Sequence, residues 1–308
     1  MAIDTITIVG LGALGTMYAD FLVNALPPES VRVVADKQRR ERYQTGGIYV
    51  NGKRIDKKLV FVDPADAGDP ADLVIFACKY TALPQAMEDA ANQVGDDTTI
   101  ISVLNGVVSE GDLAQRFGVE KVLLCVAQEM DTVRVGNKTT YKHFGRLALG
   151  MIGDDERTSK RLDAVEDLFY DIEMPFWEPN DIQHQMWSKL MYNDGINQAC
   201  AVFDCPYGGV QRGGVARDTM LGAMRETAAV AQAEGIDLTE KDIEGWKRSL
   251  DTLDPSGMPS MKQDADAHRK TEVALFGETV CNLARKHRIA TPINDMLVRR
   301  IHDMEAQY

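Results

Sequence analysis

Residues 6–15 read Ile-Thr-Ile-Val-Gly-Leu-Gly-Ala-Leu-Gly, and this stretch decides the fold of the first half of the chain. A β-branched run leads into a GxGxxG turn, and apolar residues at helical spacing follow as far as Leu26. Residues 31–35 supply a second strand, so the pattern predicts a βαβ unit. In such a unit the glycine turn approaches a pyrophosphate at the start of the helix. The residues expected to bind a dinucleotide are therefore Gly10, Leu11, Gly12, Ala13, Leu14 and Gly15.

Polar residues follow the next two predicted strands. Residues 73–77 and 99–103 read as buried parallel strands, and Lys79 and Asn105 come directly after them. The carboxyl ends of parallel strands share one edge of a sheet, so both side chains are expected beside the glycine turn. The plainer interpretation makes Lys79 a surface lysine and Asn105-Gly106 a simple turn.

The end of the second strand bears on the choice of nicotinamide cofactor. Asp36 stands where an acid would bind the ribose 2′-hydroxyl of NAD, whereas Lys37, Arg39 and Arg40 offer positive charge to the 2′-phosphate of NADP. We expect NADP with Lys37 and Arg40 as contacts. Asp36 keeps NAD open, and a solvated helix start would equally explain the basic residues.

Composition excludes several functional classes. The net charge of −13 disfavours binding to nucleic acid or to an anionic membrane surface. Five scattered cysteines form neither a disulfide framework nor a CxxC metal site, so we expect free thiols and no metal. A cytoplasmic location is expected, because the chain shows neither a signal-peptide pattern nor a membrane-length apolar run.

The character of the sequence changes near residue 180. Before it, residues 122–127, 147–152 and 171–177 are expected to be strands, and residues 128–145 resist assignment. After it, helical periodicity dominates, with helices expected over 218–234, 240–253, 264–286 and 294–304. The prediction is an α/β plus all-α protein, with a Rossmann-like domain over residues 1–178 and a helical domain over 179–308.

The stretch 186–197 places Lys189, Asn193 and Asn197 at positions i, i+4 and i+8 of a predicted helix. Their side chains fall within a stripe about 80° wide and would face a common target. A solvated helix face is the competing interpretation. Ser260 lies in a loop that enters another helix, where it either contacts a carboxylate or caps the helix.

In this order, the motifs resemble those of the ketopantoate reductase (2-dehydropantoate 2-reductase) family. They run from GLGALG through Trp187-x-Lys189-x3-Asn193-x3-Asn197 to Ser260 and Glu272. The resemblance implies a Rossmann domain that binds NADPH, a helical domain, and reduction of a 2-keto acid, ketopantoate, in pantothenate biosynthesis. It further implies that Lys189 is the general acid and that Asn193, Asn197 and Ser260 bind substrate. By the same resemblance, the cofactor and active-site contacts are Lys79, Asn105 and Glu272.

Some features depart from the family pattern. Asp36 replaces a usual basic residue, Tyr207-Gly208 stands where Asn-Gly is common, and Ala274 stands where an aspartate is frequent. The keto acid therefore stays open among related 2-keto acids. A β-hydroxyacid dehydrogenase and a catalytically silent NADP-binding sensor are the other hypotheses. The partner is a small 2-keto acid rather than nucleic acid or membrane, and a homodimer is possible.

Overall fold

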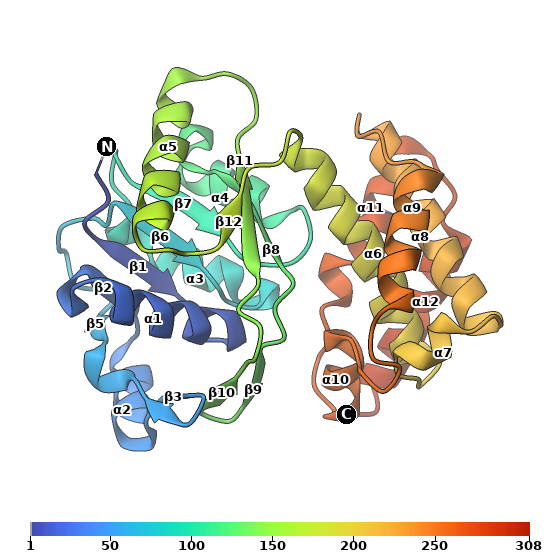
Figure 1. The fold of residues 1–308 in the computed structure, drawn as a ribbon, viewed down its shortest axis with the longest axis horizontal. Helices are drawn as coiled ribbons and strands as arrows, with labels where there is room; N and C mark the ends of the chain where they lie inside the picture. The colour runs from blue at the N-terminus through green and yellow to red at the C-terminus, as the bar shows by residue number, and fades with distance from the viewer. Residues whose placement is uncertain (1) are drawn as a thin grey trace. The chain divides into compact units, whose positions relative to one another are not determined.

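The computed structural model describes residues 2–308, which divide into two compact units. The first comprises residues up to Asn105 together with Ser109–Ile182. The second comprises Gly106–Val108 together with Gln183–Tyr308. The domain boundary predicted from sequence follows residue 178, whereas this division falls after Ile182. Figure 1 shows the helices and strands of both units.

A five-stranded parallel sheet forms the centre of the first unit, in the order β5-β2-β1-β6-β7. The predicted strands that begin and surround the glycine turn are all present, which confirms the βαβ unit and the two buried strands. Ile6 of β1 is aligned with Val31 on one side and with Leu73 on the other. The strands are β1 (Ile6–Val9), β2 (Val31–Val34), β5 (Val60–Val62), β6 (Leu73–Phe76) and β7 (Thr99–Ser102).

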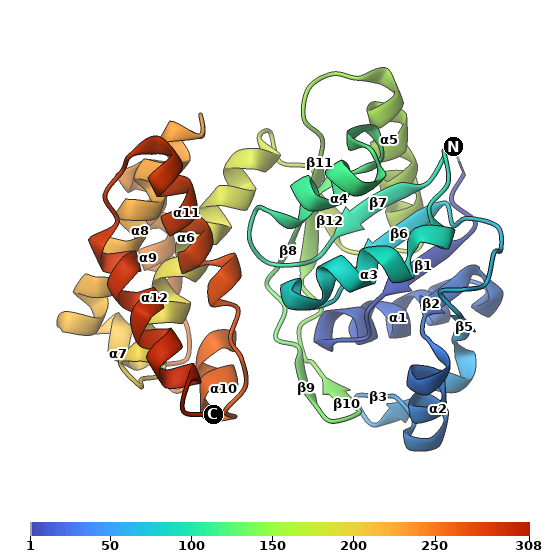
Figure 2. The ribbon, with the colours of Figure 1, turned by 180° about the vertical axis from the view of Figure 1, so that it is seen from behind.

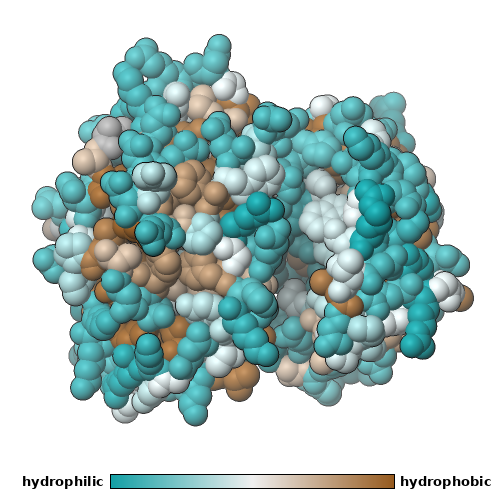
Figure 3. Space-filling model, in the orientation of Figure 1, coloured by the Kyte–Doolittle hydropathy of each residue, from teal (hydrophilic) through white to brown (hydrophobic). Residues whose placement is uncertain are grey.

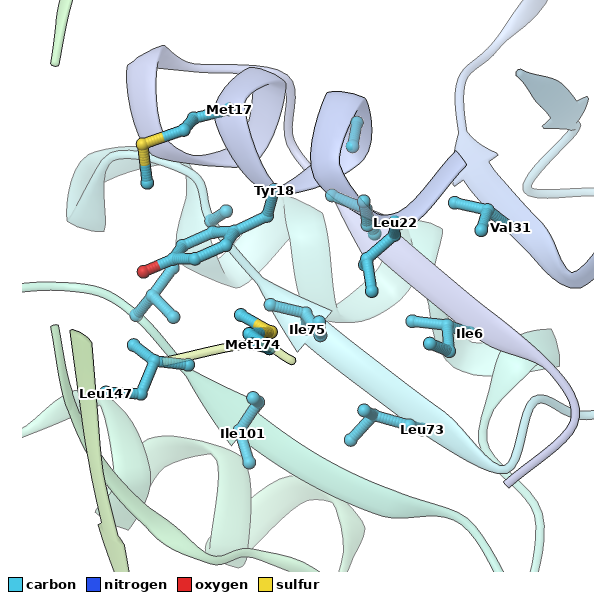
Figure 4. Close-up of a cluster of buried hydrophobic side chains, with 14 of the residues drawn as sticks. Ile6, Met17, Tyr18, Leu22, Val31, Leu73, Ile75, Ile101, Leu147 and Met174 are labelled. Atoms are coloured by element: carbon cyan, nitrogen blue, oxygen red, sulfur yellow. The ribbon is translucent and has the colours of Figure 1, made fainter. Parts of the chain in front are cut away.

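Helices cover both faces of this sheet (Figures 1 and 2). Alternate residues of β1 point to opposite faces, so Ile8 packs in the cluster under α1 and α5 whereas Val9 packs in the cluster under α3 and α4. In Figure 4, Tyr18 and Leu22 of α1 lie over the strand residue Ile75. The helices are α1 (Ala13–Ala25), α3 (Leu83–Asp89), α4 (Ser109–Phe117) and α5 (Glu156–Asp171).

Three further strands form a separate small sheet in the order β12-β11-β8. They are β8 (Leu124–Gln128), β11 (Arg146–Gly150) and β12 (Phe176–Trp177). The expected strand over 171–177 is wrong in extent, since only its last two residues are extended. Its first residue instead ends α5, a helix with a clear aspartate N-cap that was not predicted from the sequence.

The segment 128–145, unassigned from sequence, contains a β-hairpin. Its strands β9 (Val133–Val135) and β10 (Lys138–Thr140) join the hairpin around Asn51-Gly52, which is formed by β3 (Tyr49–Val50) and β4 (Lys53–Arg54). The resulting sheet has the order β4-β3-β10-β9. Strand β3 of this sheet follows α2 (Lys37–Gly46) in the chain.

In the described part of the second unit, the named elements are all helical, as expected. The helix expected over 264–286 is wrong, because it is interrupted between Asp266 and Gly277. The first helix ends just before His268, which has a left-handed φ of 51°, and the Arg269 N–H closes that end by donating to the Asp264 carbonyl oxygen at 2.9 Å. Beyond it, the Glu305 carboxylate accepts hydrogen bonds from the backbone N–H and the hydroxyl of Thr271, both at 2.7 Å. The α-helices are α6 (Ile182–Val202), α7 (Tyr207–Gln211), α8 (Val215–Ala233), α9 (Glu240–Asp251), α10 (Ser260–Asp266), α11 (Gly277–His287) and α12 (Pro292–Glu305).

Short 3₁₀ turns link several elements of both units. They are η1 (Pro28–Ser30), η2 (Asp56–Lys58), η3 (Tyr80–Ala82), η4 (Ala91–Gln93), η5 (Val119–Lys121) and η6 (Val273–Leu275). On the face seen in Figure 3, the surface of the second unit is mostly hydrophilic. Over residues 2–308, none of the helices combines the length and the apolar character that crossing a membrane requires.

Candidate active site and cofactor-binding loop

The glycine turn between β1 and α1 admits no side chain at two of its positions. Gly10 has a φ of 100°, and a Cβ there would lie 2.9 Å from Cys78 Cβ. A Cβ on Gly15 would lie 2.0 Å from the carbonyl oxygen of Gly10. The first glycine therefore makes the turn and the third lets the helix pack against it.

The N-terminus of α1 is prepared for an anion. Gly12 is its N-cap residue, with neither a side-chain capping bond nor an acidic residue in the first turn of this helix. The first N–H groups of a helix lack intrahelical acceptors and carry partial positive charge. A pyrophosphate fits such a turn, so the structure is compatible with the expected dinucleotide.

A pocket lies beside this turn, at the carboxyl ends of β1, β2 and β6. Ligands of open α/β sheets bind at this edge, and the adenosine half of a dinucleotide suits a pocket with apolar walls and a few polar groups. Tyr43, Cys78 and Asp89 were not predicted here from the sequence, and only Cys78, which directly follows the predicted strand over 73–77, had a usable signal. The lining residues are Val9, Gly10, Leu11, Val34, Arg39, Tyr43, Cys78, Ala82, Ala86 and Asp89.

Two of the basic residues after β2, Arg39 and Arg40, are already paired with acids. Asp36 caps α2 by accepting a hydrogen bond from the Arg39 backbone N–H at 2.7 Å. The Arg39 guanidinium donates to Asp89 at 3.0 Å, and that of Arg40 donates to Asp63 at 2.6 Å. These ion pairs reduce the positive charge that the two arginines offer to a 2′-phosphate.

The remaining predicted cofactor residues of the first unit lie in three separate segments of the chain. Lys37 is the exposed first residue of α2. Lys79 is exposed at the N-cap position of η3, directly after β6. Asn105 is half-buried and precedes Gly106, whose φ of 90° makes the turn. All three follow the strands to which the sequence pattern assigned them.

In the second unit, α6 brings three predicted substrate-binding residues together. Asn197 is 3% exposed, and its Oδ1 accepts hydrogen bonds from Ser260 Oγ at 3.2 Å and from the Met261 backbone N–H at 3.1 Å. Its Nδ2 donates to Asn193 Oδ1 over 3.5 Å. The solvated-face interpretation is therefore wrong for Asn197, which ties the start of α10 to α6.

The other predicted residues of this unit are placed as follows. Lys189 lies half-buried on α6, one turn before Asn193. Glu272 is half-buried at the N-cap position of η6. The helix-capping interpretation of Ser260 is wrong, since Pro259 occupies the N-cap position and no side chain caps α10.

A second polar stripe on α6 is sealed inside the unit. Asp194 and Gln198 are both 0% exposed, and Gln198 Nε2 donates to Asp194 Oδ1 at 2.7 Å and to Asn294 Oδ1 at 3.0 Å. The Thr227 hydroxyl lies 2.7 Å from Asp194 Oδ2 and 3.0 Å from the Ala223 carbonyl oxygen. Its single hydrogen cannot serve both acceptors, so a proton on Asp194 would let the acid donate to the hydroxyl while the hydroxyl donates to Ala223.

The pKa of the Asp194 carboxyl agrees with this network. Burial, with the negative charge of Glu226, raises that pKa to about 8 against the opposing hydrogen bond from Thr227. The shift favours the protonated carboxyl at neutral pH. Within residues 2–308, the histidines, cysteines and acids form no group that could hold a metal ion.

Comparison with known proteins supplies the family. Residues 6–153 match the family described as Ketopantoate reductase PanE/ApbA, and residues 181–305 match its C-terminal domain. The 2-dehydropantoate 2-reductase of Streptococcus pyogenes serotype M3 is 26% identical over 250 residues, which are 81% of either chain.

Two solved structures show the same fold. D-mandelate dehydrogenase in complex with NADH and anilino(oxo)acetate superposes with a TM-score of 0.86 at 21% identity, over 98% of this chain and 99% of that one. A ketopantoate reductase from Staphylococcus aureus, described as dimeric, gives a TM-score of 0.79 at 21% identity, over 98% and 99%. With two family matches that together span most of its length, the chain belongs to the ketopantoate reductase family.

Proposed function

We propose that this protein reduces a 2-keto acid to a 2-hydroxy acid with a nicotinamide dinucleotide. The observation that carries the proposal is the polar face of α6, where buried Asn197 holds Asn193 and Ser260 on the helix that also bears Lys189. Family membership and the uncapped glycine turn support it. The nicotinamide supplies hydride to the ketone carbon when it is bound.

Lys189 is proposed as the general acid. A reduced ketone leaves an alkoxide, and an ammonium placed beside it both stabilises the negative charge and gives up a proton. Asn193 and Ser260 are neutral, so they orient the carboxylate and hydroxyl ends of a substrate without competing for that proton. Because the Oδ1 of Asn197 already accepts two hydrogen bonds, we assign it the positioning of these two side chains.

The leading substrate is ketopantoate, the 2-dehydropantoate for which the Streptococcus relative is named, and pantothenate biosynthesis is the proposed pathway. A second candidate is a 2-keto acid with an aromatic side chain. An aromatic pair beside the Lys189 stripe favours it, since Tyr192 stacks on Trp246 at 4.3 Å and Trp246 Nε1 donates to Ser188 Oγ at 2.8 Å. The superposed D-mandelate dehydrogenase is named for a hydroxy acid of that class.

NADPH stays the expected cofactor, with Lys37 as its 2′-phosphate contact. The alternative is NADH, which the ion pair between Arg40 and Asp63 favours because that arginine is neutralised. The Asp36 carboxylate also repels a 2′-phosphate at this end of β2. The preference between the two cofactors therefore depends on whether the attraction of Lys37 for a 2′-phosphate outweighs the repulsion from Asp36.

A substrate and cofactor panel tests the proposal. Purified protein is mixed with NADPH or NADH and with ketopantoate, phenylglyoxylate and other 2-keto acids, and cofactor absorbance is followed. Oxidation with at least one keto acid is expected. Its absence with all of them would refute a 2-keto acid reductase. In a parallel assay with NADP+ or NAD+ and 3-hydroxy acids, reduction of the cofactor would indicate a β-hydroxyacid dehydrogenase. Cofactor binding without turnover in either assay would indicate a sensor.

Cofactor preference is tested by comparing KM for NADPH and NADH in Lys37→Ala and Arg40→Ala proteins. If the phosphate contact is correct, Lys37→Ala raises KM for NADPH and leaves KM for NADH unchanged. The exposed Lys57 on η2 provides a matched control as Lys57→Ala. An unchanged KM for NADPH in all variants would refute the 2′-phosphate contact.

A homodimer is the proposed assembly, in line with the dimeric description of the Staphylococcus aureus enzyme. Light scattering on the purified protein tests it, with a molar mass twice the 34.1 kDa of the chain as the expected result. A mass of one chain across the concentration range would refute it. The cytoplasmic location stays a prediction.

A further inference from the structure

Arg134 reaches the glycine turn from the segment 128–145, which the sequence pattern left unassigned. It lies on β9, and its Nη1 donates to Thr16 Oγ1 at 2.7 Å and to the Gly12 carbonyl oxygen at 3.2 Å. The same nitrogen bonds the carbonyl oxygen of Leu11. Its Nε donates to the Gly136 carbonyl oxygen at 3.0 Å. The guanidinium is therefore fixed against the N-terminus of α1.

The charge at this position is not balanced by the protein. No carboxylate among residues 2–308 forms an ion pair with Arg134, and the ionisable groups that act on its pKa are Tyr43 and Arg42. Burial lowers that pKa, yet a guanidinium stays protonated. A cation beside a helix N-terminus is unfavourable by itself, because that end of the helix is already positive. An anion at the glycine turn would stabilise both the Arg134 guanidinium and the N-terminus of α1.

The Arg134 guanidinium also has N–H donors that are not used within the described chain. It carries five N–H groups, and those on Nε and Nη1 face acceptors in the hairpin and the glycine turn. Nη2 has no hydrogen-bond partner in the described chain, and the side chain is half-buried rather than sealed. One edge of Arg134 is thus available to a ligand.

We propose that Arg134 binds the pyrophosphate of the dinucleotide, opposite the N–H groups that begin α1. This inference rests on the proposed cofactor and adds a contact that depends on phosphate charge alone. Guanidinium groups bind phosphate oxygens through charge-assisted hydrogen bonds, which are among the stronger hydrogen bonds in proteins. The contact serves NADH and NADPH equally, because both contain the same pyrophosphate.

A purely structural role for Arg134 is the competing explanation. The hairpin has anchors of its own, however: Asn137 Nδ2 donates to the Gly47 carbonyl oxygen at 3.1 Å, and the Tyr49 backbone N–H donates to the Asn137 carbonyl oxygen at 3.0 Å. Strand pairing of β10 with β3 adds to these. Loss of the guanidinium should therefore leave the hairpin in place.

The test measures binding of three probes to the wild-type protein and to Arg134→Met and Arg134→Lys. NADH, ADP-ribose and adenosine differ in that only the first two carry a pyrophosphate. Arg134→Met should weaken the binding of NADH and of ADP-ribose by roughly 10-fold to 100-fold, the usual range for a hydrogen bond to a charged group. Adenosine, measured by competition, should bind as to wild type. The affinity of Arg134→Lys for NADH and ADP-ribose should lie between those of wild type and of Arg134→Met.

Arg32 provides a matched control, because its guanidinium also donates to a backbone carbonyl, that of Asp69, at 2.7 Å. It lies near the amino end of β2, whereas the glycine turn follows the carboxyl end of the neighbouring strand β1. Arg32→Gln should bind all three probes as wild type does.

Three outcomes decide the matter. Unchanged ADP-ribose affinity in Arg134→Met would refute the contact. Equal losses for adenosine and ADP-ribose, with a lower melting temperature, would assign Arg134 a structural role instead. If the wild-type protein bound neither NADH nor NADPH, the proposed function itself would fail, which this design separates from a failure of Arg134.

Discussion

Helix α6 carries two polar stripes with the same spacing and different surroundings. Asn193 and Asn197 lie on one stripe, and Asp194 and Gln198 lie on the other, about 100° further round the helix. The first stripe keeps Lys189 and Asn193 half-exposed, whereas the second is fully enclosed. Spacing shows which side chains share a direction. Whether they face a ligand or the protein interior depends on the helices that pack against them.

The enclosed stripe shows what a purely structural polar group looks like. Asp194 contacts Thr227 and Gln198, and burial raises the pKa of its carboxyl to about 8. Lys189, on the other stripe, is only half-buried. Substitutions on the two stripes, and at Ser260 of α10 which contacts the first stripe, should therefore separate catalysis from stability. The largest effect is expected at Lys189 and the smallest at Ser260.

Lys189→Ala should lower kcat by on the order of 100-fold or more, because the proton donor is lost. Cofactor affinity should be nearly unchanged. Steady-state kinetics with the best keto acid from the panel and a fluorescence titration with the cofactor measure both. The exposed Lys241 of α9 supplies the control as Lys241→Ala. Turnover equal to wild type would remove Lys189 from the chemistry.

Asn197→Ala should reduce the free energy of unfolding by about 1–3 kcal/mol, since the buried Met261 N–H loses its acceptor. It should also raise KM, because Ser260 and Asn193 lose the residue that positions them. Asn193→Ala removes a half-buried amide and should raise KM with little loss of stability. Urea unfolding compares the two. Equal stabilities would contradict the positioning role of Asn197.

Asp194→Asn should change the pH dependence of stability. The folded pKa of about 8 is above the ordinary value of 3.8, so Asp194 contributes stability at low pH that is lost as the pH rises towards 8. One proton gives a slope of at most about 1.4 kcal/mol per pH unit. The free energy of unfolding of Asp194→Asn minus that of wild type should therefore increase as the pH rises from 5 to 8.

Urea unfolding at pH 5.5, 6.5 and 7.5 checks this, with tryptophan fluorescence as the signal, to which Trp187 and Trp246 contribute from the second unit and Trp177 from the first. The asparagine amide can donate to Thr227 as the protonated acid does, so kcat should be unchanged. A constant difference between the two proteins at all three pH values would show that Asp194 is ionised in the folded state.

Ser260→Ala should have the smallest effect. Its hydroxyl is exposed and makes one hydrogen bond, to Asn197, so stability should change by less than about 0.5 kcal/mol. If Ser260 also contacts the substrate, KM should rise several-fold while kcat stays near wild type. Unchanged KM would leave Ser260 as a surface residue beside the site.

The parts of this protein that were predictable from its sequence are those whose contacts are local. The glycine turn, the strands around it and the helical second half follow from spacing and residue type alone. The prediction of a helix over 264–286 failed because the helix ends just before His268, which adopts the left-handed conformation where glycine is the usual residue. The segment after it is held by Glu305, more than 30 residues from Thr271 along the chain. Neither feature is marked by a local sequence pattern.

The candidate site divides in the same way. The motif order pointed to Lys189, Asn193, Asn197 and Ser260, and the structure brings the last three together. Arg134 escaped notice because its hairpin reaches the glycine turn across more than 115 residues of chain. A lone arginine in an irregular segment gives no signal before the fold is known.

The β9–β10 hairpin links the two ends of the proposed dinucleotide site. Asn137 donates a hydrogen bond at the end of α2, the helix that begins with the residues expected to decide cofactor choice. Arg134 donates hydrogen bonds to the glycine turn and the first turn of α1. Anyone who re-engineers Asp36 or Lys37 to exchange one nicotinamide cofactor for the other works on a helix tethered to that turn. Libraries for such an exchange should therefore vary the hairpin together with the helix.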